Sequence, residues 1–400
     1  MAQAANLNFN GAAVAGCSIA GSNYTCATFN LLATDRVLIA SGYNVSVGAP
    51  VAFSYNQGLT MSGTAALTVK GNLDIGDINP SNLSIGGGAL TATDGTFKMG
   101  AQQQTIVADI TAAAIKIGTG SNSKVTGTLS ASGNIDIASH ATVVGAISGA
   151  NVSTASPVAL SGNVSASGTF TLASGSTLAG SVSAATVNIN ASNSTVNGNI
   201  TATGSATVGS GNTVNGNLVS PIVTIDSSSV EVNGNVTAKT SLSMGSGDAI
   251  SGDVEAGKVT LASSESYIGG NAKVDSIVLN WHGRVYKTIT CNAPAPGAPC
   301  SCVTNNSGYD ANTTPKGPSC GPPPAVPGPH HILISHPGTA LTCQPQTVSV
   351  TACANEGCSV PHYTSGTNVT LTPGGKVFAT GSTGVNGAAT GQQTAAEPVI

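Results

Sequence analysis

Charged side chains are scarce in this chain of 400 residues. Only 7% of its residues are Asp, Glu, Lys or Arg, whereas an average soluble domain contains roughly 25%. Arg36 and Arg284 are the only arginines, and the net charge is −4. The chain has only 12 Lys and Arg side chains, too few to form a basic patch. The sequence therefore predicts neither nucleic acid nor an anionic membrane as a partner.

Aromatic residues and long apolar runs are rare as well. Aromatics make up 4% of the chain, and Trp281 is the only tryptophan. The sequence therefore offers few stacking platforms of the kind that single-stranded nucleic acids and sugars need. No apolar run approaches the roughly 20 residues that cross a bilayer as a helix, so we expect no membrane insertion.

What the chain has instead is glycine at a fixed interval. Each of these glycines has an aliphatic residue two positions before it and, in nearly every case, two positions after it, as in Val214-Asn215-Gly216-Asn217-Leu218. A fixed period of about 18 residues is typical of a solenoid whose repeats bury their apolar faces by stacking. The alternation around each glycine has the period of a β-strand. The glycines of this frame are Gly127, Gly145, Gly162, Gly180, Gly198, Gly216, Gly234, Gly252 and Gly270.

A second apolar pair follows within each coil, for example Phe170 with Leu172 or Ile222 with Ile225. Its position shifts by one residue between neighbouring coils, which indicates a superperiod of two coils. The sequence thus predicts an all-β fold: a parallel β-helix over residues 35–286 with two or three short strands in each coil.

Asparagine follows several of the frame glycines, as in Asn163, Asn199, Asn217, Asn235 and Asn271. Stacked Asn side chains can form a ladder of hydrogen bonds along the axis. Alternatively, Asn stands there because it tolerates a turn-like backbone beside glycine. Both interpretations give the row a structural role.

Nine cysteines lie outside the regular coils. Zinc is the competing interpretation to disulfides, but Cys300-x-Cys302 lacks the usual spacing of two residues, and no second pair of ligands follows. We expect disulfides, with Cys17 bound to Cys26, and hence an oxidising compartment. The odd count leaves one cysteine unpaired or paired outside this chain. The nine are Cys17, Cys26, Cys291, Cys300, Cys302, Cys320, Cys343, Cys353 and Cys358.

Both ends of the predicted β-helix need covering, because an open end exposes core and unpaired strand edges. We expect residues 1–34 to form an N-terminal cap closed by the first disulfide loop, and Trp281 to cover the last coil. His282 beside it is interpreted as structural rather than catalytic. The opening Met-Ala-Gln-Ala-Ala resembles the tail of a cleaved signal peptide, and we expect a fragment of a longer secreted protein.

The remaining sequence changes character twice. Residues 287–329 are rich in Pro and Cys and predict a stiff linker. Residues 330–400 contain strand-like runs broken by turn residues, which predict the start of an antiparallel, Ig-like β-sandwich. His330, His331 and His336 lack an acidic partner nearby, so we predict no metal and no cofactor.

Two families resemble parts of this chain. Coils such as Val232-Asn233-Gly234-Asn235-Val236 resemble those of bactofilins, which are cytoplasmic polymer-forming proteins built as right-handed β-helices. This resemblance implies a right-handed β-helix here as well. The segment from His331 to Pro373, with Cys343, Cys353 and Cys358, is similar to a domain of MshQ-like proteins associated with the mannose-sensitive haemagglutinin type IV pilus. The second resemblance also accounts for the cysteines. It implies an exported bacterial surface protein, an adhesin, with pilus subunits or surface glycans as partners.

The sequence therefore favours a non-enzymatic protein whose β-helix is a stalk or presentation platform. A self-assembling filament is the first alternative, since an open coil end templates further stacking. A polysaccharide-active enzyme would need convergent carboxylates, yet the acidic residues fall at different coil positions. Ice binding needs an unbroken Thr array, and Val219 and Glu255 interrupt the outward row. The acidic residues considered are Asp136, Asp226, Asp248 and Asp253.

Overall fold

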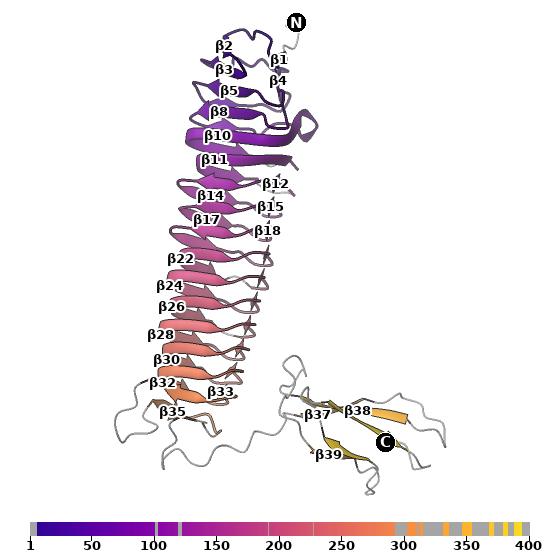
Figure 1. Cartoon of the computed structure of the whole chain (residues 1–400), viewed down its shortest axis with the longest axis vertical. Coiled ribbons are helices and arrows are strands. Elements are labelled where there is room, and N and C mark those ends of the chain that lie inside the picture. Colours follow the sequence, from indigo (N-terminus) through magenta and orange to yellow (C-terminus); the bar gives the residue numbers. More distant parts are fainter. Residues whose placement is uncertain are drawn as a thin grey trace. The chain divides into compact units, whose positions relative to one another are not determined.

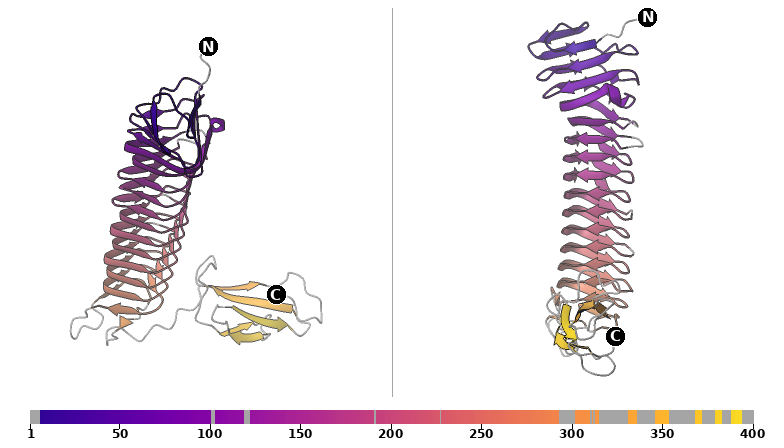
Figure 2. Two further views of the ribbon diagram at one scale, coloured as in Figure 1. Left: turned by 45° about the horizontal axis from the view of Figure 1, so that its top comes forward. Right: turned by 90° about the vertical axis from the view of Figure 1, so that its right-hand side faces the viewer.

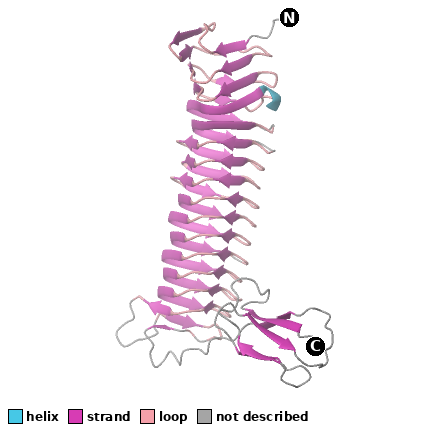
Figure 3. Ribbon diagram, turned by 45° about the vertical axis from the view of Figure 1, so that its right-hand side comes forward, coloured by secondary structure: helices cyan, strands magenta, loops and turns pink. Residues whose placement is uncertain are grey.

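The computed structural model describes residues 6–100, 103–118, 122–190, 192–226, 228–292, 302–309, 311 and 313–314, and strands at 331–335, 346–353, 368–371, 379–382 and 388–393. The chain divides into two compact units, Met1–Cys320 and Gly321–Ile400. The first unit is a rod of stacked coils (Figure 1). It contains about 15 coils and confirms the predicted parallel β-helix. Among the described residues the only helical element is the short turn η1 (Pro80–Asn82) (Figure 3).

Parallel strands build the regular part of the rod in three stacks. The strands of the first stack are β12 (Lys124–Thr126), β15 (Thr142–Val144), β18 (Ala159–Ser161), β21 (Thr177–Leu178), β23 (Thr195–Val196), β25 (Thr213–Val214), β27 (Glu231–Val232), β29 (Ala249–Ile250), β31 (Tyr267–Ile268) and β33 (Arg284–Val285). The second stack begins with β13 (Leu129–Ala131), β16 (Ile147–Gly149) and β19 (Val164–Ala166), and the third with β14 (Asn134–Ile137), β17 (Asn151–Thr154) and β20 (Thr169–Thr171).

From β22 onward, one bent strand per coil serves both the second and the third stack. A register shift between Ala184 and Thr186 of β22 marks the bend. These longer strands are β22 (Val182–Ile189), β24 (Ile200–Val208), β26 (Leu218–Ile225), β28 (Val236–Met244), β30 (Val254–Leu261) and β32 (Ala272–Leu279).

The coils near the N-terminus are larger (Figure 2). Hydrogen-bonded partners on successive coils are 23 residues apart for Thr64 and Ser41, but 18 apart for Ser181 and Asn163 further along. The strands of this part are β1 (Asn6–Phe9), β2 (Cys17–Ala20), β3 (Asn23–Cys26), β4 (Arg36–Ile39), β5 (Asn44–Val47), β6 (Val51–Ala52), β7 (Gly58–Ser62), β8 (Ala66–Lys70), β9 (Leu73–Asp74), β10 (Leu83–Met99) and β11 (Thr105–Ile117). Because β1 pairs in parallel with β4, coil stacking begins inside the expected cap.

The inward frame follows the glycine pattern. Val232 and Ile250, two residues before their glycines, are fully buried, as are Phe170 and Leu172 of the second apolar pair. One predicted inward residue is wrong.

Ile222 is 43% exposed, and Val223 is buried in its place. The register shift between Ser220 and Ile222 puts Val223 and Ile225 on the inward face, two residues apart as strand geometry requires.

The frame glycines are required because backbones of successive coils approach closely. A Cβ built on Gly216 would lie 2.6 Å from the carbonyl carbon of Gly198 and closer still to its oxygen. The same obstacle, the carbonyl group of the preceding glycine, recurs from Gly145 to Gly270. No side chain fits into that gap, so the period seen in the sequence marks this contact.

A second repeated feature follows the same superperiod of two coils. One corner of nearly every coil holds a residue with left-handed backbone, and the φ angles of Gly211, Ser229, Gly247 and Glu265 are 66°, 64°, 71° and 61°. Glycine, which adopts this conformation without strain, thus alternates with other residues.

Strand stacking continues beyond the boundary expected at residue 286. The strands β34 (Ile289–Cys291), β35 (Val303–Asn305) and β36 (Thr313–Thr314) add to the end of the rod, where Ile277 of β32 pairs with Val303. Trp281 therefore does not cover the last coil, and this prediction was wrong. Its side chain is 59% exposed.

The second unit contains antiparallel strands in its described part. β37 (His331–Ser335), β38 (Gln346–Cys353) and β41 (Ala388–Gln393) form one sheet, and β39 (Asn368–Leu371) pairs with β40 (Ala379–Ser382). The Ig-like sandwich remains a prediction, because most of residues 330–400 lie outside the described part.

Candidate functional site

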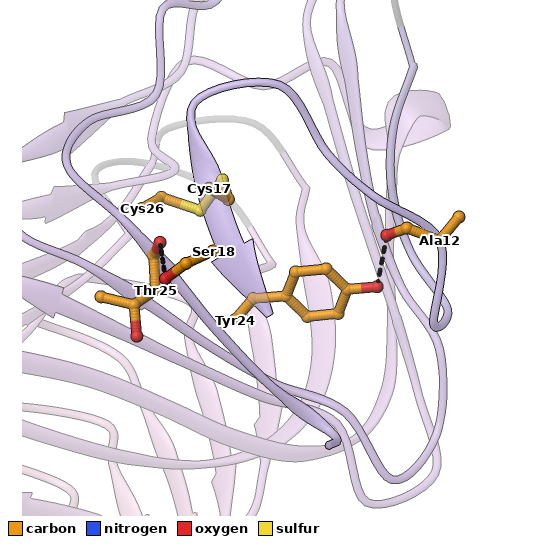
Figure 4. Close-up of a disulfide and its surroundings, with 6 residues drawn as sticks. All are labelled: Ala12, Cys17, Ser18, Tyr24, Thr25 and Cys26. Carbon is orange, nitrogen blue, oxygen red and sulfur yellow. Dashed lines mark hydrogen bonds between the residues drawn. A yellow bond between two sulfur atoms is a disulfide. The ribbon is translucent and has the colours of Figure 1, made fainter. Parts of the chain in front are cut away.

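The N-terminal end of the rod is closed by a disulfide-linked hairpin. β2 pairs antiparallel with β3, and Cys17 and Cys26 face each other and form a disulfide, as expected (Figure 4). β3 in turn stacks in parallel on β5. The outermost strand of this stack, β2, is therefore antiparallel to the strands below it.

Aromatic side chains fill the space beneath this hairpin. Tyr24 is 1% exposed, and its hydroxyl donates to the carbonyl of Ala12 at 2.7 Å and accepts from the amide of Gly11 at 2.8 Å (Figure 4). Phe9 packs edge-on against Tyr24 with ring centroids 4.9 Å apart, and Phe29 stacks on Phe9 at 5.8 Å. A buried tyrosine whose hydroxyl is satisfied holds the first loop over the core.

A second disulfide joins Cys291 of β34 to Cys302, which directly precedes β35. Cys353 of β38 is also disulfide-bonded. The other four, Cys300, Cys320, Cys343 and Cys358, lie outside the described residues. Complete pairing of all but one of the nine cysteines stays a prediction.

The candidate acidic residues occupy different places on the coils. Asp136 accepts from the hydroxyl of Ser153 at 2.7 Å on the outer face, and Asp253 belongs to the row after the glycines, where it accepts from the amide of Asn271 at 2.7 Å. Asp248 points inward and is fully buried. Only Asp226 lies near enough for its charge to influence Asp248.

Asp248 is a buried carboxyl with an incomplete set of partners. Its Oδ1 accepts from the amide of Val230 at 3.1 Å, and its Oδ2 has no hydrogen-bond partner. Burial raises the pKa of Asp248, the backbone amides of Val230 and Gly245 act in the opposite direction, and the charge of Asp226 raises it slightly further.

Two coils earlier, the equivalent position holds Asn212, whose amide group donates to the carbonyls of Gly209 at 2.7 Å and Ile189 at 2.9 Å. An amide thus satisfies this buried corner, which an ionised carboxylate does not. We assign Asp248 a structural position rather than a catalytic one.

The asparagine row does form a ladder, but mainly from backbone amides to side-chain oxygens; Nδ2 of Asn271, which donates to Oδ1 of Asp253 at 3.1 Å, adds a bond between side chains. The backbone amide of Asn217 donates to Oδ1 of Asn199 at 2.8 Å, and the backbone amide of Asn235 donates to Oδ1 of Asn217 at 2.9 Å. A true side-chain ladder runs one step before the glycines, where Nδ2 of Asn215 donates to Oδ1 of Asn197 at 2.7 Å. This second row was not predicted, although Asn recurs there at the same period.

His331 begins β37, whereas His330 and His336 lie outside the described residues. Within the described part of the chain, no three His, Cys, Asp or Glu side chains are placed to hold a metal ion. Nor does that part contain a helix long and apolar enough to cross a membrane.

One cluster of aromatic rings lies at the last coils, in which Trp281 is exposed and His282 and Tyr309 are half-buried. The rings of Trp281 and His282 stack at 4.6 Å with 21° between their planes, and His282 lies 5.7 Å from the ring of Tyr309. The guanidinium carbon of Arg284 lies 3.8 Å from the centre of the Tyr309 ring, and Arg284 donates to its hydroxyl. Arg284 comes from β33 and Tyr309 from the turn after β35, so the strand stacking beyond residue 286 assembles this cluster.

Comparison with known proteins identifies one feature. Residues 330–397 match a domain of unknown function, DUF8613. No curated protein and no solved structure was found to match the chain.

Proposed function

We propose that this chain is an exported bacterial surface protein whose β-helix is a stalk or presentation platform. Its likeness to MshQ-like proteins supports association with a type IV pilus and a role in adhesion. The role is non-enzymatic, and pilus subunits or surface glycans are the partners.

The disulfide-closed N-terminal hairpin is the observation that carries this proposal. Disulfides persist in oxidising compartments such as the periplasm and the cell surface. The pair Cys17 and Cys26 lies in a hairpin held over buried aromatic residues, which is a structural position rather than a redox-active one.

Cell-surface labelling tests the proposal in the bacterium that encodes the chain. Antibodies against residues 122–280 should label intact cells, and protease added outside the cells should remove the label. A cytoplasmic marker protein is the control for cell integrity. Labelling that requires permeabilised cells would contradict the proposal.

A self-assembling filament is the second candidate, favoured by the regular parallel coils. The antiparallel strand β2 argues against filament formation at the N-terminal end. A further coil could not add to β2 by the parallel pairing that joins the other coils. Small-angle scattering and electron microscopy of the purified chain separate the two candidates. Monomeric rods support the stalk, and fibrils of unlimited length support the filament.

A further inference from the structure

The exposed Trp281 occupies a corner that carries small residues in earlier coils. The amide of Gly247 donates to the carbonyl of Ser264, the amide of Ser264 to that of Trp281, and the amide of His282 to that of Ser307. The carbonyl of Ser264 and the carbonyl of Trp281 thus each accept a backbone hydrogen bond from the coil before, whether the side chain is small or an indole. Stacking of the coils does not require a tryptophan here.

Arg284 of this cluster, like Arg36, forms no ion pair with an acidic side chain among the described residues. The ion pairs among the described residues are Lys98 with Asp74 and Lys273 with Glu255, and neither involves Arg284. One donor of the Arg284 guanidinium is bound to the Tyr309 hydroxyl. The fork geometry of a guanidinium suits a carboxylate.

We propose that Trp281, His282, Arg284 and Tyr309 form a binding site for an acidic saccharide chain. A sugar ring stacks its C–H face on the exposed indole of Trp281, while a carboxylate of the chain pairs with Arg284. Aromatic rings with polar tips provide both an apolar face and hydrogen bonds, which a sugar ring requires.

The surroundings of the cluster favour a saccharide over other partners. Among the described residues, Trp281 is flanked along its corner by the small residues Ser264, Ser307 and Gly308. An apolar protein surface would need a wider apolar patch. Nucleic acid would need several more cations than this chain provides.

Intrinsic fluorescence of the purified full chain reports on this site directly, because Trp281 is the only tryptophan. The probes are a tetramer of galacturonic acid and, as the neutral comparison, a tetramer of glucose. We expect a saturable change in emission with the acidic tetramer, with a Kd of about 1 mM or below. The neutral tetramer should bind at least about tenfold more weakly.

Arg284→Gln should weaken binding of the acidic tetramer by about tenfold or more, and Lys287→Gln, which removes an exposed cation three residues away, should leave it unchanged. Circular dichroism of both variants checks that the rod remains folded. Calorimetric titration of Trp281→Phe, which lacks the reporter, should show weaker binding.

Three results would overturn the proposal. They are the absence of a saturable change with the acidic tetramer, equal binding of both tetramers, and equal losses in the Arg284 and Lys287 variants. Protection of Trp281 from acrylamide quenching in the full chain would also overturn it, because another part of the chain would then cover the site. These measurements do not depend on the cellular location of the protein.

Discussion

Replacing Gly216 by alanine should destabilise the rod strongly, because the added methyl group would meet the backbone of the preceding coil. The new Cβ would lie 2.6 Å from the carbonyl carbon and 3.0 Å from the next amide nitrogen of the preceding coil, at Gly198 and Asn199. These are backbone atoms, and the backbone amide of Asn199 is held by its hydrogen bond to the hydroxyl of Ser181 at 3.2 Å. They cannot rotate away as a flexible side chain would.

Two contributions determine the magnitude. Overpacking costs about 1 to 3 kcal/mol when neighbours can shift, and more when they cannot. Alanine also lowers the conformational entropy of the unfolded chain relative to glycine, which offsets at most about 1 kcal/mol of this destabilisation. We therefore expect a net loss of about 3 kcal/mol in the free energy of unfolding.

Gly86 provides a matched control in the same fold. A Cβ on Gly86 would meet only the carbonyl oxygen of Met61, at 4.0 Å. Gly86→Ala should therefore change the free energy of unfolding by less than about 0.5 kcal/mol.

Urea unfolding followed by circular dichroism measures both variants. Because coils contact only their neighbours and need not unfold together, hydrogen exchange near residue 216 should accompany it. Equal midpoints for the two alanine variants would refute the explanation of the glycine period.

Three further predictions concern the core and the N-terminal end. Asp248→Asn should raise the stability at pH 7 by about 1 to 3 kcal/mol, since it supplies a donor at a buried corner. Burial raises the pKa of Asp248 in the folded rod above 3.8. The wild-type chain therefore loses stability as pH rises above 3.8 and Asp248 ionises. In thermal melts, the stability gained by Asp248→Asn should shrink toward about pH 4. Val232→Asp buries a charge in a dry core and should cost about 4 kcal/mol or more. An unchanged melting temperature would show that the inward frame is wrong, and Glu231→Gln on the exposed side is its control. Replacing Cys17 and Cys26 together by serine should cost about 2 to 3 kcal/mol locally, seen as faster hydrogen exchange in β2 and β3, and equal exchange rates would contradict the role of the disulfide as a staple.

The sequence was sufficient to predict the coil type and its inward face. Glycine, valine and isoleucine at a fixed period reflect local geometry, because each coil repeats the contacts of its neighbour. Val232 and Ile250 are fully buried for this reason. The pairing of Cys17 with Cys26 also followed from their short separation in the chain.

Features that depend on distant or irregular contacts could not be predicted. The exchange of Ile222 for Val223 follows from a bulge that only the register of the neighbouring strands reveals. Trp281 was placed over an end because the coil that follows it contains an insertion between Cys291 and Cys302. Spacing alone does not show that β35 returns to β32 after this insertion.

The candidate binding site shows how a repeat can carry a site that its period does not predict. Coil stacking fixes the backbone at the left-handed corner, where His282 has a φ of 63°, close to the 61° of Glu265 one coil earlier. The side chains at that corner are outside the core, so they can vary without loss of stacking. The large exposed ring of Trp281 therefore needs a reason other than packing of the rod. Trp281 is connected through His282 to Tyr309, on whose ring Arg284 lies, and Arg284 is the one arginine in the regular part of the rod. Binding of an acidic saccharide is the reason we propose for the exposed ring, and the saccharide titration tests it.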